Sequence, residues 1–484
     1  MESRAAQQPA PCTGRCPCRI SAGQGRIFRA GRHPGSGRRR ISQPARHPPH
    51  SRFRAQIARI MIRTDIASLE LTAGSGWTDV LRRINLYLFA LLPLLLLFWR
   101  GGADAAASVI GISFLAVVIA RRQWGLATHP LFAALLAIWL LLNLLVSPLA
   151  VDPAASFSRS VVWLRFALLF AAATCWLIQS RRDLKLVVVI WSATLAVSIV
   201  DGLVQLISGT SLTGNPMYNT TRLTGPLDRP NIGMFVARLG FPLLAAAPLL
   251  LGLRGRGIHI AAVAVAAVVG FVFILLTGER SAALLCAAAL GAAGLGGILT
   301  FPRYRLQVLA TLLVTGSIGG VVAAMSERIW YRVLQFGTVL KHFADSHYAE
   351  LFGIGFDIWY NYPVFGAGMK NFQASCWAIS APQVTDGCPT HPHNIYIEWL
   401  AETGTVGLVF YLAFLVLVLA AAWPLLRGST TARLTGLLVA GCFVVLLFPL
   451  IATQSQFSNW PALVFWTSLA LTMAIARLAL KEHS

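Results

Sequence analysis

The feature that most constrains this chain is a series of apolar runs that recurs from Leu81 to the C-terminal region. Each run is roughly 17–25 residues long, which as a helix is enough to cross a hydrocarbon core about 30 Å thick. The period-2 alternation that is typical of strands is not seen in them. Because only helices and closed barrels satisfy the backbone polar groups inside a bilayer, the pattern predicts an all-α fold.

Composition supports this prediction and argues against a soluble protein. The chain has 484 residues, of which 56% are hydrophobic and 12% charged, and its mean hydropathy is +0.66. Soluble domains of this size carry roughly 25% charged residues. We therefore expect a polytopic membrane helical bundle of about twelve transmembrane helices. The expected spans are 84–99, 104–120, 130–149, 160–179, 185–207, 231–252, 258–276, 281–300, 306–324, 404–426, 434–453 and 459–478.

The orientation follows from the basic residues in the short connections, since such loops are retained in the cytoplasm. Every second connection carries at least two Lys or Arg residues, which places both termini in the cytoplasm and predicts a multi-pass protein of the bacterial inner membrane. The basic residues are Arg82 and Arg83; Arg121 and Arg122; Arg181, Arg182 and Lys185; Arg254 and Arg256; Arg303 and Arg305; Arg427 and Arg433; Arg477 and Lys481.

The connections between these face outward, and one of them is much longer than the rest. Residues 325–403 join the ninth and tenth spans, and a connection of this length usually has short helices of its own and a function. We expect a large periplasmic loop here. Its last part, Asn394–Glu402, alternates apolar and acidic residues at helical spacing, which predicts an amphipathic helix near the outer interface.

Residues 1–60 differ from the rest of the chain. They hold 13 Arg against one acidic residue, Glu2, and so contribute +12 of the formal net charge of +22. This stretch is rich in Gly, Pro, Ser and Arg and is typical of a disordered basic extension. It is either an unstructured arm or an extension upstream of a true start at Met61. The predicted membrane domain is 61–484, with membrane lipids rather than nucleic acid as partners.

Three arginines lie in outward connections, where the orientation rule disfavours positive charge. Arg222 and Arg229 precede the sixth span, and Arg280 follows the seventh. Guanidinium groups bind phosphate oxygens in pairs, so two or three of them around one cavity could hold a diphosphate. The alternative is structural: anchoring to lipid headgroups, or a surface pair between Glu279 and Arg280.

Charged residues also fall within the spans, where each costs on the order of 3 kcal/mol unless it meets a partner or water. These are Arg165, Asp201 and Arg238. Either Asp201 pairs with one of the two arginines, or the three line a polar cavity that opens outward. Both interpretations predict a bundle with a polar interior.

The segment His391-Pro392-His393-Asn394 closes the long outward loop. An imidazole accepts a proton near neutral pH and is the usual general base, although a structural loop histidine is the alternative. Two histidines at i and i+2 could also indicate a metal. No HExxH motif and no carboxylate at ligand spacing accompany them, and there is no P-loop, so we expect neither a metal nor a cofactor.

Two cysteines, Cys376 and Cys388, lie in the same outer loop, twelve residues apart. An extracytoplasmic compartment is oxidising, which favours disulfides. We expect a disulfide that closes the segment just before His391.

Several motifs together resemble the superfamily of O-antigen ligases and O-antigen polymerases. They are Thr277-Gly278-Glu279-Arg280-Ser281, Arg222 with Gly225-Pro226, Tyr362–Phe372, His391–Asn394 and the segment Leu400–Leu408 containing Glu402-Thr403-Gly404. The resemblance covers roughly residues 200–425. Two positions depart from the family pattern: Glu279, where a small or polar residue is common, and Glu350, where many members have a basic residue.

The resemblance implies a metal-independent, inverting glycosyltransferase with no cofactor. Such enzymes take a glycan from an undecaprenyl-diphosphate donor and pass it to a hydroxyl of a lipid or polysaccharide acceptor at the periplasmic face. His393 corresponds to the base, and Arg222 and Arg280 to the groups that bind the diphosphate. Arg229, Arg238, His391 and Asn394 are further substrate-binding candidates.

A second class of function has the same number of spans: a flippase or exporter of lipid-linked sugars. A transporter usually has paired halves, broken helices and charges at the midplane of both halves. Here the charges cluster asymmetrically and one outer loop dominates, which favours the enzyme. Ligation, polymerisation and protein glycosylation use the same site chemistry, so the sequence leaves the acceptor open.

Overall fold

The computed structural model describes residues 65–71, 76–252, 257–325, 341–379 and 387–482, together with 327, 330, 331 and 337. All of them belong to the compact unit Phe53–Ser484. The predicted basic extension, 1–60, lies outside the described residues. Within the described part the chain is helical, and its extended pairings are two isolated bridges, Thr210 with Pro216 and Tyr218 with Arg222. The predicted all-helical fold class is therefore confirmed for these residues.

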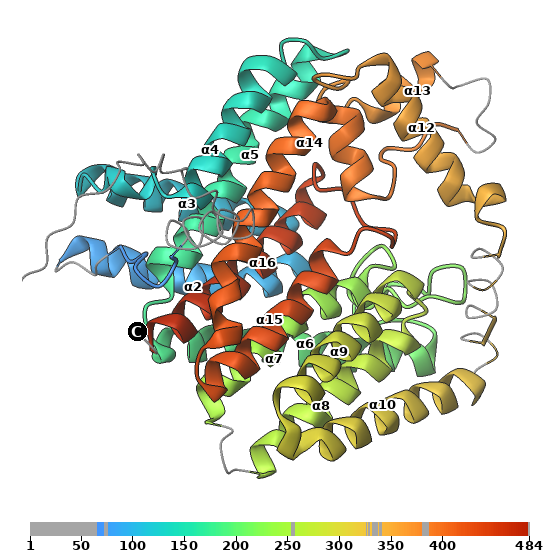
Figure 1. The fold of residues 1–484 in the computed structure, drawn as a ribbon. Coiled ribbons are helices and arrows are strands. Elements are labelled where there is room, and N and C mark those ends of the chain that lie inside the picture. The colour runs from blue at the N-terminus through green and yellow to red at the C-terminus, as the bar shows by residue number, and fades with distance from the viewer. Residues whose placement is uncertain are drawn as a thin grey trace, which may run out of the picture. The chain divides into compact units, whose positions relative to one another are not determined.

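Most helices follow one another with short connections; the longer ones are 209–231, between α6 and α7, and the segment from α10 to α14 that contains α12 and α13 (Figure 1). The first half contains α2 (Trp77–Phe98), α3 (Arg100–Ala120), α4 (Pro130–Leu141), α5 (Pro153–Ala172), α6 (Arg181–Ser208) and α7 (Ile232–Leu251). The second half contains α8 (Gly257–Leu276), α9 (Arg280–Thr300), α10 (Arg305–Met325), α12 (His347–Asn361), α13 (Phe372–Ile379), α14 (Ile395–Ala422), α15 (Thr430–Leu447) and α16 (Asn459–Lys481).

Ten helical segments of the described chain are long and apolar enough to cross a membrane. Two shorter apolar helices, Pro130–Val146 and Ala261–Leu276, coincide with the remaining two of the twelve predicted spans. The described residues thus contain ten candidate membrane-spanning helices, as expected of a multi-pass membrane protein, and the predicted number of twelve is not established. The clearest boundary difference concerns the predicted span 434–453: α15 ends at Leu447 because Phe448 is extended and precedes Pro449. Residues 448–458 form a loop instead.

Helix α16 lies in the interior of the bundle and contacts α2, α5, α7, α14 and α15 (Figure 1). Every residue from Ala462 to Ala479 is buried. A helix that is apolar on all faces is expected inside a bundle rather than at its surface. Because α16 begins at Asn459 and α7 at Ile232, this packing brings the starts of two inner helices near the same loops.

The charged residues within the helices do not pair with one another, although such pairing was one of the two interpretations of the sequence. Arg165 forms an ion pair of 3.1 Å with Asp104. Asp201 accepts a hydrogen bond of 2.6 Å from the backbone N–H of Leu212, and Arg238 donates one of 3.3 Å to Gln454. Pairing of Asp201 with either arginine is therefore wrong. The bundle does contain polar interior groups, as both sequence interpretations required.

Helix α14 is kinked at Gly404, which has φ +67° and ψ −174°. The backbone groups freed by the kink bond to the loop before α13: Thr405 N–H donates to Pro363 at 2.9 Å, and Ala367 N–H donates to Ala401 at 2.9 Å. A Cβ at Gly404 would lie 2.2 Å from the carbonyl oxygen of Val364, so only glycine allows this approach. The kink coincides with the predicted start of the tenth span.

The turns of α14 before the kink correct another expectation. The acidic residues Glu398 and Glu402 are 1% and 0% exposed, and Trp399 between them is fully buried. This segment is therefore not an amphipathic helix with its acids toward water. Both carboxylates point inward because they accept hydrogen bonds from the backbone of two loops, at Gln456 and at Phe372.

Candidate functional site

A cavity of about 550 Å³ lies where four helices begin, α7, α9, α12 and α16. The first N–H groups of a helix have no partner within it and its dipole is positive there, so each of these ends favours an anion. We call this cavity the arginine–histidine cavity. Its polar and charged lining residues are Arg100, Tyr218, Arg222, Arg229, Asn231, Glu279, Arg280, Ser281, Tyr348, Thr390, His391, His393, Thr453, Gln454, Ser455 and Ser458.

Five residues singled out from the sequence line this one cavity: Arg222, Arg229, Arg280, His391 and His393. They come from three connections, 208–230, 277–280 and the long segment after α10. The three connections assigned to the same side of the membrane from sequence therefore meet in space. Two other candidates, Arg238 and Asn394, do not line the cavity.

Arg222 is held by a short hairpin in the connection after α6. Tyr218 and Arg222 exchange backbone hydrogen bonds of 2.9 and 3.0 Å, and the guanidinium lies 6.0 Å from the Tyr218 ring centroid. One terminal nitrogen of Arg222 donates to the carbonyl of Pro230 at 2.9 Å, while Nε is buried without a hydrogen-bond partner among the described residues. The side chain is positioned but retains donors for a ligand.

A glycine brings the Arg222 hairpin against the loop that carries Arg280. Leu223 N–H donates to the Thr277 carbonyl at 3.0 Å. Gly278 has φ +72°, and a Cβ there would lie 2.7 Å from the Thr221 carbonyl oxygen. Only glycine fits, which explains in physical terms why it precedes Glu279 and Arg280. The two arginines are thereby placed on adjoining backbone segments.

Glu279 does not form the surface pair with Arg280 that was one reading of the sequence. Its carboxylate is buried and accepts hydrogen bonds from Gly233 N–H at 2.7 Å and Met234 N–H at 3.1 Å, at the start of α7. Burial raises the pKa of Glu279 to about 7, against the opposing effects of Arg222 and of these two hydrogen bonds. The carboxylate thus fixes α9 to α7 through the positive end of α7.

The side chains of Arg229 and Arg280 form no hydrogen bond or ion pair with any residue in the described part of the chain. Arg280 is the first residue of α9 and is half-buried, and Arg229 is exposed. An arginine at the N-terminal end of a helix is disfavoured by the helix dipole. The dipole of α9 therefore disfavours the positive charge of Arg280 in the protein alone. An anion bound in the cavity would reverse this preference.

The two histidines lie side by side, with ring centroids 4.1 Å apart. His393 has φ +53°, an uncommon backbone conformation for a residue other than glycine, and its carbonyl accepts from Thr453 N–H at 2.7 Å. Burial lowers the pKa of His393, with His347 as a second cause. Burial, His393 and Lys370 together lower the pKa of His391 to about 3. Both imidazoles are therefore neutral at pH 7 and able to accept a proton.

Asn394 acts on the backbone rather than in the cavity. It is the N-cap of α14: its Oδ1 accepts from Tyr396 and Ile397 N–H, at 2.9 and 3.2 Å, and its Nδ2 donates to Pro449 at 2.7 Å. All the polar atoms of this amide are engaged. Asn394 therefore fixes the start of α14 directly after His393 and is not placed to contact a substrate.

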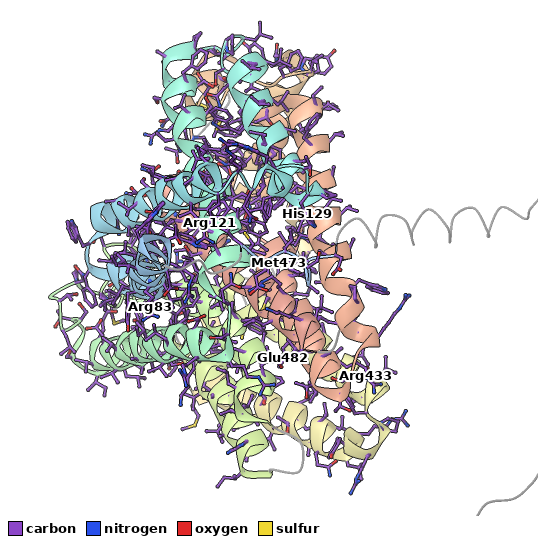
Figure 2. All side chains as sticks on the ribbon, turned by 90° about the vertical axis from the view of Figure 1, so that its left-hand side faces the viewer. Arg83, Arg121, His129, Arg433, Met473 and Glu482 are labelled. Atoms are coloured by element: carbon purple, nitrogen blue, oxygen red, sulfur yellow. A yellow bond between two sulfur atoms is a disulfide. The ribbon has the colours of Figure 1, made fainter. Side chains whose placement is uncertain are left out.

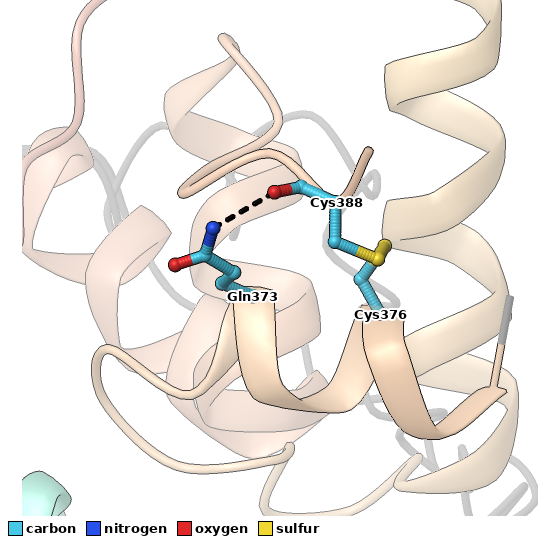
Figure 3. Close-up of a disulfide and its surroundings, with 3 residues drawn as sticks. All are labelled: Gln373, Cys376 and Cys388. Atoms are coloured by element: carbon cyan, nitrogen blue, oxygen red, sulfur yellow. Dashed lines mark hydrogen bonds between the residues drawn. A yellow bond between two sulfur atoms is a disulfide. The ribbon is translucent and has the colours of Figure 1, made fainter. Parts of the chain in front are cut away.

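A disulfide precedes the histidines (Figure 3). Cys376 in α13 and Cys388 are joined with an S–S distance of 2.01 Å, and Gln373 in the first turn of α13 donates to the Cys388 carbonyl at 2.9 Å. The segment leading to His391 is thereby fixed to α13. The lengths of chain on both sides of the histidines are anchored, one by the disulfide and one by the Asn394 cap.

Sequence reasoning missed two parts of the cavity. Arg100 lines it, pairs with Asp228 at 3.1 Å and lies 5.9 Å from the Trp460 ring centroid. As a cation in a connection predicted to face outward, it carried the same signal as Arg222. The loop after α15 contributes Thr453, Gln454, Ser455 and Ser458. Three of these residues fall in the connection 454–458 between the last two predicted spans, whose polar composition was the available signal, and Thr453 was placed in the predicted span 434–453.

Arg238 lies just behind this second part. It is fully buried in α7, and its hydrogen bond to Gln454 links it to a residue of the cavity lining. Arg238 is thus linked to the cavity through Gln454 and does not line it.

The arrangement has the chemistry of a site for a phosphorylated ligand that loses or accepts a proton. Cationic side chains, helix N-termini and two neutral imidazoles line the same cavity. Within the described residues, no group of three or more His, Cys, Asp or Glu side chains could hold a metal ion.

Comparison with known proteins adds one match. Residues 265–412 match the family described as O-antigen ligase. The match includes Arg280, the disulfide, both histidines and the kink at Gly404, so the resemblance drawn from the motifs is confirmed there. Members of this family are O-antigen ligases or polymerases, enzymes of the glycosyltransferase type. No curated protein sequence matches the chain.

Proposed function

Taking residues 265–412 as an O-antigen ligase domain, we propose that the chain is a membrane glycosyltransferase that uses undecaprenyl-diphosphate-linked glycan. The acceptor is a hydroxyl of a lipid A-core or of a growing polysaccharide, and the reaction takes place at the periplasmic face of the inner membrane. The observation that carries the proposal is the convergence of Arg222, Arg229 and Arg280 with a neutral histidine pair on one cavity.

The proposed reaction uses the histidine and the arginines of the cavity for different tasks. His393 accepts the proton of the acceptor hydroxyl, whose oxygen then forms a bond to the anomeric carbon of the glycan. The bond from that carbon to the diphosphate oxygen breaks, and the diphosphate leaves with the electron pair. Arg222 and Arg280 stabilise the negative charge that develops on it. The diphosphate is already a good leaving group, so the step requires no nucleotide.

His393 is preferred to His391 as the base for a geometric reason. Its ring makes no hydrogen bond within the described residues, whereas His391 Nδ1 lies 3.2 Å from the Thr390 hydroxyl. The lowered pKa of His393 keeps it in the accepting form at neutral pH. Its left-handed backbone and the Thr453 bond hold the ring toward the cavity.

The family match favours a glycosyltransferase over a flippase of lipid-linked sugars, and one experiment separates the two functions. A deletion strain is complemented with His393→Ala, with wild type and with His259→Ala, whose imidazole contacts Leu251 near the end of α7 away from the cavity. We expect His393→Ala to reduce transfer at least about a hundredfold at normal protein level, while lipid-linked glycan accumulates on the outer leaflet. His259→Ala should behave as wild type.

The same strains report the acceptor. Long chains retained on the carrier indicate a ligase, and single repeat units indicate a polymerase. Normal transfer by His393→Ala would contradict the proposed base. Accumulation of donor on the cytoplasmic side would instead support a flippase.

A further inference from the structure

Arg100 differs from the other three arginines that line the cavity because it has an acidic partner. Its guanidinium lies 3.1 Å from the carboxylate of Asp228, in the connection between α6 and α7. In the described part of the chain, Arg222, Arg229 and Arg280 form no ion pair. Asp228 itself does not line the cavity, whereas the residue that follows it does. The charge of Arg100 is thus engaged by an acid just outside the lining.

The ion pair between Arg100 and Asp228 is exposed to solvent. Its side chains are 46% and 75% exposed, in contrast with 11% and 15% for the pair between Arg82 and Asp183. Water competes for both partners of an exposed pair, so such a pair contributes little to stability. A released Asp228 carboxylate would remain hydrated, and no buried charge would be left without a partner. This pair can therefore open with little effect on the fold.

A second contact holds Arg100 beside the cavity independently of Asp228. Its guanidinium carbon lies 5.9 Å from the ring centroid of Trp460, within the range of a cation–π interaction. Trp460 also lines the cavity. The indole is itself fixed, because its N–H donates to the Leu96 carbonyl at 2.8 Å and its ring stacks on Phe235 with 6.1 Å between the centroids. Arg100 therefore keeps a partner at the cavity when its carboxylate is exchanged.

The position of Arg100 in its helix also favours an anionic partner. It is the first residue of α3, where the helix dipole disfavours a cation, as it does for Arg280 at the start of α9. A guanidinium binds phosphate oxygens in the same planar geometry that it uses for a carboxylate. The carboxylate of Asp228 therefore occupies a cation that a phosphate in the cavity could equally engage.

We propose that Arg100 is a substrate-binding residue that exchanges Asp228 for a phosphate oxygen of the donor diphosphate. This deepens the proposed function and rests on it, because the donor is the lipid-linked diphosphate. Before binding, the Asp228 carboxylate competes with the donor for Arg100. After binding, Arg100 joins Arg222 and Arg280 around the diphosphate, and the carboxylate is released to water.

The exchange predicts that the two partners of the ion pair affect binding in opposite directions. The affinity for undecaprenyl diphosphate is measured on the purified protein in phosphatidylcholine nanodiscs. Arg100→Ala should weaken binding about tenfold, because a charge-assisted hydrogen bond to phosphate is lost. Asp228→Asn should tighten binding about two- to fivefold, because an exposed partner no longer competes. A merely structural ion pair would shift the affinity of both variants in the same direction.

Two further variants control the effect of Arg100→Ala. Arg159→Ala removes an exposed arginine that donates to Asn459 at the start of α16 and does not line the cavity. This variant should keep the wild-type affinity. Arg100→Lys keeps the charge without the planar guanidinium and should lose less affinity than Arg100→Ala. It keeps the proposal testable if Arg100→Ala does not fold.

The double variant Arg100→Ala/Asp228→Asn shows whether Asp228 acts through Arg100. Removal of a negative charge near the donor could tighten binding by itself, and it would then do so in both backgrounds. The exchange predicts that Asp228→Asn loses most of its effect when Arg100 is absent. Equal tightening in both backgrounds would overturn the proposal, and so would wild-type affinity of Arg100→Ala.

The outcome is separable from that of the proposed base, because binding requires no turnover. If His393→Ala is inactive and Arg100→Ala binds the diphosphate as wild type does, only the exchange is wrong. If His393→Ala transfers normally and the two partners shift the affinity in opposite directions, the exchange holds and the base is wrong. If the wild-type protein does not bind the diphosphate, both the proposed donor and the exchange are wrong.

Discussion

The basic residues near the start of α6 and the end of α16 serve a different purpose from those of the arginine–histidine cavity, which lies near the start of α16. Near the start of α6 and the end of α16, Arg181 pairs with Glu482, and Arg82 pairs with Asp183 at 3.2 Å. Arg477 is buried there and donates to two backbone carbonyls. Glu482 is labelled in this region in Figure 2. At the other end, the side chains of Arg229 and Arg280 have no such partner in the described chain.

This difference separates structural cations from functional ones. A cation that already has an acidic or carbonyl partner contributes to the fold, and its removal leaves that partner unsatisfied. A cation that lines a cavity without a partner contributes little to the fold. Its positive charge, together with the helix N-termini, makes the empty cavity unfavourable and an anion-filled one favourable. The two sets should therefore respond to mutation in opposite ways.

The largest expected effect is on the cavity side. Arg280→Ala should lower transfer about 10²- to 10³-fold, because a donor to the leaving group is lost. The thermal unfolding midpoint in detergent should stay within error of wild type, since the side chain has no partner to lose. Arg303→Ala, in the turn Pro302–Tyr304 at the opposite end of α9, is the matched control and should leave transfer unchanged. A large drop in the unfolding midpoint of Arg280→Ala would show that Arg280 stabilises the fold, and would contradict the distinction between structural and functional cations.

Arg477→Met tests the other set. The substitution leaves the carbonyls of Leu69 and Ile178 buried without their donor, and it should destabilise the protein by about 2–4 kcal/mol. Transfer per folded molecule should not change. Thermal unfolding and transfer are measured on the same preparation. Loss of transfer at an unchanged unfolding midpoint would show that Arg477 is not merely structural.

The disulfide should have a smaller effect. Replacing both Cys376 and Cys388 by Ser removes a cross-link over 12 residues and should cost about 2–3 kcal/mol. Transfer should fall up to about tenfold, because the histidine segment loses one anchor. Alkylation of the unfolded wild-type protein without reductant should leave both cysteines unmodified, while Cys175, Cys286 and Cys442 react. Reaction of Cys376 under these conditions would show that the disulfide does not form.

The last expected effect is on stability alone, a pH dependence at Glu279. Its pKa in the folded protein is raised from 4.5 to about 7, so the folded state favours the protonated carboxyl. The contribution of Glu279 to the stability of the folded protein is therefore fully present below pH 4.5 and is lost as the pH rises through about 7. Glu279→Gln removes this dependence, and its unfolding midpoint relative to wild type should rise between these pH values. A constant difference would contradict the raised pKa.

Much of the membrane architecture could be predicted because it depends on local composition. Apolar runs of sufficient length and basic pairs at alternate connections identified the helices. Arg222, Arg280 and His393 were found because positive charge and imidazole in outward connections require an explanation, and the cavity contains all three. What the sequence predicted least well depends on contacts between distant segments.

Glu398 and Glu402 illustrate this limit. Their helical spacing was visible, but an acid on a helix is normally exposed, and the backbone donors that bury them belong to Phe372 and Gln456. The first part of the loop 448–458, up to residue 453, was placed in a predicted span because the start of the loop at Phe448 is set by one proline. Arg100 has the signal that identified Arg222, and it was overlooked for lack of a neighbouring motif.

We propose that the arginine–histidine cavity binds a diphosphate through its arginines, two of which, Arg229 and Arg280, have no partner within the described part of the fold. The most direct test of this central claim is the affinity of the purified protein, in nanodiscs, for undecaprenyl diphosphate and for undecaprenyl monophosphate. We predict that wild type prefers the diphosphate and that the double variant Arg222→Ala/Arg280→Ala loses about 10²-fold in affinity for it, while the single variant Arg280→Ala keeps the wild-type unfolding midpoint. Equal affinity of the wild type and the double variant for the diphosphate would contradict the account.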